Sequence, residues 1–247
     1  MNHDPWFDSA ENKMLMVICA RKLIRNIGIG GIVWGVFNIV FGVVAIQATI
    51  INVGILILGV LMLGTGVQAL RNPSLGVLLT ETIVSVLLFV WNVGIAVLNQ
   101  IEVGTFEPRG LIFPLIIAGV IGNYYRKLGH LREEIASIDP GKIEAAKQVC
   151  KTLLKKKLKD EPLLVQTADR KCRVQLMDGQ AFFIQNDLLR AFVGSTEAIR
   201  SAIAKPEAKA WKLVFNHPVG KLGYNFDRKN SEKIKSWLAS RPVPAAV

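Results

Sequence analysis

A single glutamate lies within one of the long apolar stretches of this 247-residue chain, where a carboxylate could do chemistry. Glu81 falls in the stretch 74–101. A helix that begins at Leu75 places it about two turns inside a membrane, at a cost of ~3 kcal/mol. A helix that begins at Thr82 leaves it at the interface, and we prefer this interpretation because it avoids that cost. An intramembrane carboxylate would instead indicate a proton or cation site in a small transporter or channel.

A second group of candidate residues is a cluster of lysines in the polar half of the chain. The cluster consists of Lys147, Lys151, Lys155, Lys156, Lys157 and Lys159. Apolar residues of the segment 142–160 recur with a helical period, which predicts a basic amphipathic helix. Such a helix can bind anionic lipid, at ~1 kcal/mol per basic residue, or pack on a neighbouring domain while its lysines face water. We expect a surface for lipid or a protein partner, without a dedicated small-molecule pocket.

Small residues line one face of the first apolar stretch. Gly31, Gly35, Asn38 and Gly42 recur at intervals of four, three and four residues, and therefore share one side of a helix. Small residues at this spacing allow a second helix to approach closely, and Asn38 could form a hydrogen bond across the contact. Packing within the chain is the favoured interpretation, and homo-oligomerisation through these glycine-rich faces is the alternative.

The remaining residues do not form a catalytic pattern. The three histidines are far apart, and the three cysteines lack the Cys-x-x-Cys spacing of many metal and redox sites. We find no glycine-rich phosphate loop and no nucleophile elbow. Aromatic residues of the basic half alternate as in core strands, which disfavours nucleic-acid binding. We therefore expect no enzymatic activity, no cofactor and no metal site.

The elements that position these residues begin with four predicted membrane helices in residues 26–125. No charged side chain occurs from Asn26 to Leu70, and one crossing needs roughly 20 residues, so two spans fit this stretch. The apolar stretches 74–101 and 110–125 predict two more. Residues 1–25 precede the spans as a cytosolic or interfacial segment, either a short surface helix over 9–25 or an extension of the first span.

Charge predicts the orientation of these helices. Basic residues gather on one side of the spans, namely Lys13, Arg21, Lys22, Arg25, Arg71, Arg126, Lys127 and Arg132, whereas the other side has only Arg109. By the positive-inside rule both termini are cytoplasmic. The expected location is a bacterial inner membrane. The formal net charge of +11 arises entirely beyond Tyr125, where the composition changes.

The basic half is expected to contain a helical linker at 126–162, a small cytosolic α+β domain at 163–240 and a tail at 241–247. Two alternating segments flank Asp178-Gly179, a strong hairpin signal. Ser195 and Thr196 offer an N-cap for a helix to about Ala204, and Ser231 is expected to cap a closing helix.

This order of elements resembles the small bacterial pleckstrin-homology-like domains. The resemblance covers residues 163–240 and depends on the Asp178-Gly179 hairpin, the paired strands near Trp211 and Tyr224, and the closing helix with Trp237. An α+β domain of another type is the alternative. The resemblance implies a lipid- or protein-binding module rather than an enzyme. Our leading hypothesis is therefore a membrane-anchored module that docks on anionic lipid or a protein partner, and the rival is the transporter or channel that uses Glu81.

Overall fold

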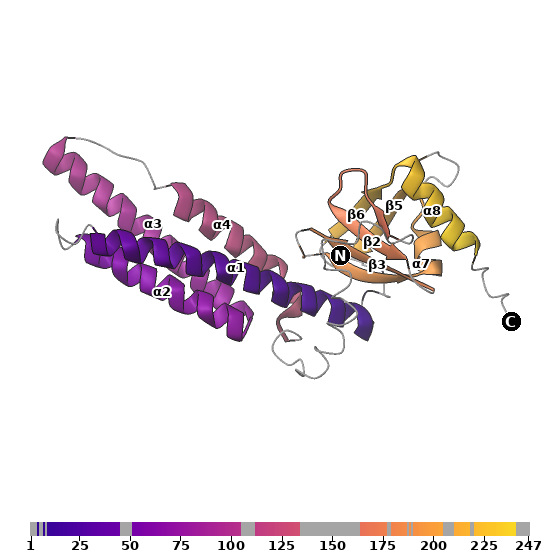
Figure 1. Ribbon diagram of the computed structural model, residues 1–247, viewed down its shortest axis with the longest axis horizontal. Helices are drawn as coiled ribbons and strands as arrows, with labels where there is room; N and C mark the ends of the chain where they lie inside the picture. The colour runs from indigo at the N-terminus through magenta and orange to yellow at the C-terminus, as the bar shows by residue number, and fades with distance from the viewer. Residues whose placement is uncertain are drawn as a thin grey trace. The chain divides into compact units, whose positions relative to one another are not determined.

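A computed structural model of the chain contains two compact units (Figure 1). The bundle unit comprises residues 21–136, and the β unit combines residues 1–20 with residues 137–247. The structure describes residues 4, 7, 9–44, 51–104, 112–133, 164–176, 179–186, 188, 190–204, 210–217 and 220–240.

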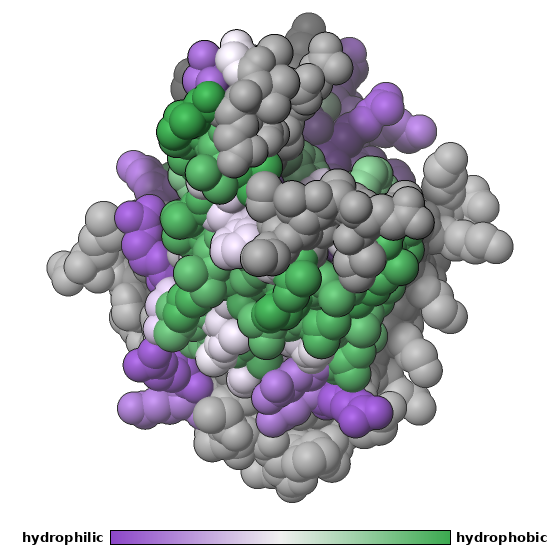
Figure 2. Space-filling model, turned by 90° about the vertical axis from the view of Figure 1, so that its left-hand side faces the viewer, coloured by the Kyte–Doolittle hydropathy of each residue, from purple (hydrophilic) through white to green (hydrophobic). Residues whose placement is uncertain are grey.

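Helices form the whole described part of the bundle unit. They are α1 (Ala10–Val44), α2 (Ile51–Arg71), α3 (Leu75–Val103), α4 (Ile112–Lys127) and the 3₁₀ turn η2 (Gly129–Leu131), and the first turns of α1 belong to the β unit. Three helices contain stretches long and apolar enough to cross a membrane, at Asn12–Val43, Val53–Arg71 and Leu75–Leu98. Many large hydrophobic side chains of these helices are exposed. Figure 2 shows a broad hydrophobic area on the end of the bundle unit that faces the viewer. These helices indicate a membrane-embedded protein.

One helix start follows one of two sequence alternatives, and another differs from the preferred interpretation. The helix α1 is continuous from Ala10, so residues 9–25 extend the first span instead of forming a separate surface helix. The helix α3 begins at Leu75, directly after Pro73 and Ser74, and not at Thr82. The Thr80 hydroxyl, on the first turns of α3, donates a hydrogen bond to the Gly76 carbonyl at 3.0 Å. Because proline favours an extended residue before it, the break falls at Pro73, and no residue interrupts the helix between Leu75 and Glu81.

Glycines bring the backbones of α1 and α2 close together. A Cβ atom added to Gly35 would lie 2.8 Å from the Gly59 carbonyl oxygen, and one added to Gly66 would lie 2.6 Å from the Gly28 carbonyl oxygen. Because real Cβ atoms do not approach so closely, a side chain at either position would separate the two helices. The helices therefore pack through their glycine faces, as membrane helices often do.

The β unit contains two antiparallel sheets. The first has the strand order β1 (Leu164–Gln166), β2 (Cys172–Leu176), β3 (Gln180–Gln185) and β4 (Ala191–Ser195). The second pairs β5 (Lys212–His217) with β6 (Gly220–Asn225). The predicted hairpin is confirmed: Leu176 pairs with Ala181, and Gly179 adopts a φ of 75°, which glycine favours.

Aromatic side chains fill the space between the two sheets. The register aligns Val174, Phe183 and Phe192 across three strands of the first sheet. Phe183 and Phe192 then contact Phe215 of the second sheet, with ring centroids 5.3 and 5.0 Å apart. Trp237 belongs to the same buried cluster. The alternation seen in the sequence thus points the bulky residues to one shared core.

Two helices complete the fold of the β unit. The helix α7 (Thr196–Ser201) begins at the predicted cap, where Ser195 Oγ accepts a hydrogen bond from the Ala198 amide at 3.2 Å. The helix α8 (Arg228–Ala239) is capped by Asp227, not by Ser231. Ser231 is buried one turn inside the helix, and its Oγ accepts a hydrogen bond from the Trp211 amide at 3.0 Å. The prediction that Ser231 caps this helix is therefore wrong, because its side chain instead binds the backbone at Trp211.

The N-terminal segment completes the β unit, although the whole bundle separates the two in sequence. Phe7 is fully buried in the aromatic core, with its ring centroid 5.1 Å from that of Phe192 and 4.8 Å from that of His217. The Asp4 amide donates to the Asn216 carbonyl at 2.9 Å. The Asn12 side chain forms hydrogen bonds with both the amide and the carbonyl of Val193, on the edge strand β4. Asp4, Phe7 and Asn12 therefore connect this segment to both β4 and β5.

We expect Phe7→Ala to destabilise the β unit by about 3–5 kcal/mol, because the substitution leaves a cavity among aromatic rings. Chemical unfolding of the full chain in detergent, followed by the fluorescence of Trp211 and Trp237, measures this loss. Phe182→Ala is the matched control, because Phe182 lies on the opposite face of β3 and is only partly buried. An equal effect of the two substitutions would contradict the role given to Phe7.

Candidate functional site

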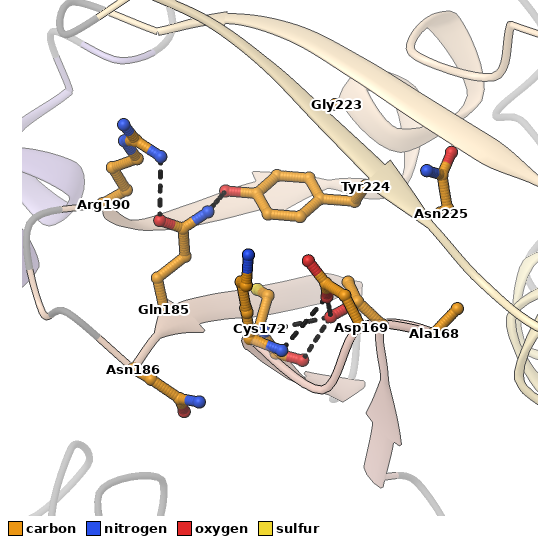
Figure 3. A pocket seen from close by; sticks show the side chains of 11 residues that line it. Ala168, Asp169, Cys172, Gln185, Asn186, Arg190, Gly223, Tyr224 and Asn225 are labelled. Carbon is orange, nitrogen blue, oxygen red and sulfur yellow. Dashed lines mark hydrogen bonds between the residues drawn. The ribbon is translucent and has the colours of Figure 1, made fainter.

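A polar pocket of about 550 Å³ opens on the surface of the β unit (Figure 3). Its lining comes from three segments: the turn 167–172 between β1 and β2, residues 185–190 between β3 and β4, and residues 223–225 on β6. The first sheet and the second sheet meet here, since the Ala168 amide donates to the Asn225 carbonyl at 2.8 Å. The pocket thus lies where strand ends and turns converge.

The Thr167 side chain organises one wall of the pocket. Its hydroxyl accepts a hydrogen bond from the Cys172 amide at 3.0 Å and donates one to Asp169 Oδ1 at 2.6 Å. Asp169 Oδ1 also accepts from the Lys171 amide at 3.1 Å. These two hydrogen bonds, with a minor attraction from the nearby Lys171 side chain, hold the pKa of the exposed Asp169 carboxyl below its ordinary value. The wall is a tight, hydrogen-bonded turn, in which Arg170 adopts a φ of 58°.

The opposite wall contains a chain of three polar side chains. Arg190 Nη1 donates to Gln185 Oε1 at 3.3 Å, and Gln185 Nε2 donates to the Tyr224 hydroxyl at 3.4 Å (Figure 3). Arg190 Nε is buried and has no hydrogen-bond partner among the described residues. No described carboxylate forms an ion pair with Arg190. Its guanidinium group therefore has unused donors beside an open pocket.

This arrangement suits an anion. Lys171 and Arg190 contribute positive charge to the lining, and Asp169 is the only carboxylate among the described lining residues. Arginine binds phosphate or carboxylate through its paired donors, and lysine adds a point charge. Sequence reasoning missed the pocket and expected none, because its lining residues come from three separate turns. The charged run Asp169-Arg170-Lys171, which the structure places between β1 and β2, was the available signal.

The lysine cluster predicted to bind lipid or a partner lies outside the described residues. This applies to Lys147, Lys151, Lys155, Lys156, Lys157 and Lys159. Its helix and its role stay predictions.

The glycine-rich face of α1 contacts other helices of the same chain. Gly35 and Gly42 face α2, where a Cβ on Gly42 would lie 3.1 Å from the Leu56 backbone nitrogen. Asn38 Nδ2 donates to the Trp34 carbonyl within α1 at 2.8 Å, instead of bonding across the contact. Gly31 faces a different helix, because a Cβ there would overlap the Glu81 carboxylate. Homo-oligomerisation through these faces stays a prediction.

Glu81 lies inside the bundle unit and is 1% exposed. Neither carboxylate oxygen has a hydrogen-bond partner in the described part of the chain. The Thr65 hydroxyl lies near this carboxylate but donates to the Met62 carbonyl at 3.1 Å. The Ser85 hydroxyl, one turn along α3, is also buried and without a partner. The structure therefore separates two candidate sites, an anion pocket in the β unit and a buried carboxylate in the bundle unit.

Neither a search for metal-ligand clusters nor a comparison with known proteins indicates a function. Among the described residues, no group of three or more His, Cys, Asp and Glu side chains is placed to hold a metal ion. No protein-family model, curated protein or solved structure matches this chain.

The hydrogen bond from Thr167 predicts a measurable titration effect at the pocket. Because the pKa of Asp169 is lowered in the folded state, its stabilising contribution is present above about pH 4 and is lost as the pH falls through the folded-state pKa. We expect Thr167→Val to move this pKa upward, toward its ordinary value. NMR titration of the full chain with ¹³C-labelled aspartate measures it, with Thr196→Val as a control. An unchanged midpoint would show that Thr167 does not hold the carboxylate.

Proposed function

We propose that the chain is a membrane-anchored binding module whose β unit binds the phosphate group of anionic phospholipids in the polar pocket. The observation that carries this proposal is Arg190, whose buried Nε has no partner and whose guanidinium group lines an open pocket without an ion-paired carboxylate. A buried donor without a partner is costly, and a bound phosphate oxygen would satisfy it. The proposed role is recognition, not catalysis.

The charge around the pocket favours an anionic ligand. Arg170, Lys171 and Arg190 lie on the turns that form the pocket, and Arg173 lies on the adjacent strand β2. The lysine cluster at 147–159 would add to this charge. A basic surface is attracted to acidic lipid over about a Debye length, and the attraction falls with added salt.

Anchoring makes a weak lipid contact effective. The β unit includes residues that come before α1 enters its apolar stretch and residues that follow α4. It is therefore tethered to the bundle unit by both of its chain connections. A tethered domain meets lipid at a high effective concentration, so a modest affinity is sufficient for docking.

The same contacts favour four membrane crossings. Asp4, Phe7 and Asn12 contact β4 and β5, which supports a location of this segment and the β unit on one side of the membrane. The number of crossings between them is then even. Three helices are long and apolar enough to cross a membrane, and α4, at 16 residues or about 24 Å, would supply a short fourth crossing. The eight-to-one distribution of basic residues supports a cytoplasmic location for this side, in a bacterial inner membrane.

The element order supports a pleckstrin-homology-like assignment for residues 163–240. The β2–β3 hairpin, the paired strands β5 and β6, and the closing helix α8 with Trp237 are the features on which the sequence resemblance depends. In such a domain, a pocket formed by inter-strand turns is a reasonable place for a lipid headgroup.

The proposal is tested on the full chain in nanodiscs of phosphatidylcholine, with or without phosphatidylglycerol. We expect hydrogen exchange of the turn 167–172 to slow when phosphatidylglycerol is present, and high salt to reverse this protection. The double substitution Lys171→Gln/Arg190→Gln should remove the protection, because it removes both pocket cations.

Lys229→Gln/Lys235→Gln is the matched control, because it removes two exposed charges from α8. Equal exchange in both lipids, or loss of protection in the control variant to the same extent, would reject the pocket as a lipid site. A protein partner would then be the better hypothesis.

A further inference from the structure

A groove of about 450 Å³ runs along the bundle unit between α1 and α4. The volume is within the range of sites for drug-sized molecules. Glu81 of α3 and Met62 of α2 line it together with residues of α1 and α4. Several of the lining side chains, such as Val33 and Ile116, are exposed on the outer surface of the bundle unit. In a membrane this groove would open toward the hydrocarbon.

The Glu81 carboxylate is the chemically distinctive group of this groove. It is 1% exposed and has no hydrogen-bond partner for either oxygen among the described residues. Gly31 on α1 makes room for it, since a Cβ atom there would lie 3.1 Å from Glu81 Cδ and overlap Oε1. A buried carboxylate without a partner is costly, and the cost falls when a cation is beside it.

Two aromatic rings lie on the walls of the same groove. Trp34 of α1 and Phe113 of α4 both line it, and their ring centroids are 4.7 Å apart. The face of an aromatic ring attracts organic cations, most strongly when the ring is tryptophan. A carboxylate beside aromatic rings in an apolar groove is a combination that favours a cation with an apolar body.

A hydrated metal ion fits this groove poorly. Among the described lining residues, Glu81 supplies the only side-chain oxygen atoms. Calcium takes six to eight oxygen ligands and magnesium keeps an octahedral set, so two carboxylate oxygens are insufficient for either ion. An organic cation needs only the opposite charge and an apolar surface.

We propose that this groove binds a lipophilic organic cation, with the cationic centre beside Glu81 and the apolar body against Trp34 and Phe113. This site is independent of the anion pocket in the β unit, because it lies in the other unit and selects the opposite charge. The proposal also assigns a ligand class to the Glu81 carboxylate, which the sequence analysis identified as a candidate site.

The test uses radiolabelled tetraphenylphosphonium and the full chain in a nonionic detergent, with binding measured by equilibrium dialysis. Saturable binding to the wild-type chain is expected. Glu81→Gln keeps the shape of the side chain without its charge, and should weaken the affinity by roughly 30-fold or more. Glu133→Gln, at an exposed position outside the groove, is the matched control and should leave binding unchanged.

Tetraphenylborate has nearly the same shape and the opposite charge, and it should not compete. Reaction of Glu81 with dicyclohexylcarbodiimide, followed by mass spectrometry, gives a second measurement that needs no variant. Tetraphenylphosphonium should slow this labelling and tetraphenylborate should not. The proposal would be overturned if the wild-type chain showed no saturable binding or if both ions competed equally. It would also be overturned if Glu81→Gln bound equally well while eluting in gel filtration as the wild-type chain does.

Discussion

The burial of Phe7 between Phe192 and His217 is the contact on which the rest of this structure depends. It places a residue from before the first apolar helix inside the core of a domain that follows the last one. A fully buried phenylalanine contributes several kcal/mol, a large part of the stability of a small domain. Asp4 and Asn12 add hydrogen bonds to β5 and β4. The β unit therefore folds from both ends of the chain.

This contact has consequences beyond the β unit. A fragment that begins after residue 136 lacks Phe7 and Asn12, which leaves the edge strand β4 without the side chain that satisfies Val193. Exposed strand edges promote unwanted pairing. The contact also supports the proposal that residues 4–12 and the β unit lie on one side of the membrane, with an even number of crossings between them.

The two units place charged groups in opposite ways. Arg190 has a buried donor without a partner beside a polar pocket, and Glu81 has two unpaired oxygens beside an apolar groove. In both places the surroundings decide the ligand class. The polar, basic loops of the β unit favour a phosphate in water, whereas the aromatic walls near Glu81 favour a cation that carries hydrocarbon. The two proposed sites would therefore select ligands of opposite charge.

Local sequence patterns predicted the elements of this fold well, because span length, strand alternation and the Asp178-Gly179 turn depend on neighbouring residues. Long-range contacts escaped prediction. Phe7 lies in a polar segment, and nothing nearby shows that its partner is Phe192. Asp227 was overlooked as a cap, because Ser231 has the same capping chemistry one turn later. Of the candidate sites, Glu81 could be singled out in the sequence as a glutamate in an apolar stretch. The pocket around Arg190 could not, because its lining residues come together only when three separate segments fold.

The central claim is that residues 4–12 and the β unit form one folded body on one side of the membrane. Oxidative cross-linking of Asp4→Cys with Asn216→Cys, in a chain without its native cysteines, tests this claim most directly in isolated membranes. The side chains of these residues already meet, since Asn216 Nδ2 donates to Asp4 Oδ1 at 3.3 Å, so an intramolecular disulfide that reductant reverses should form. A double variant that cross-links no more than either single variant would contradict the claim.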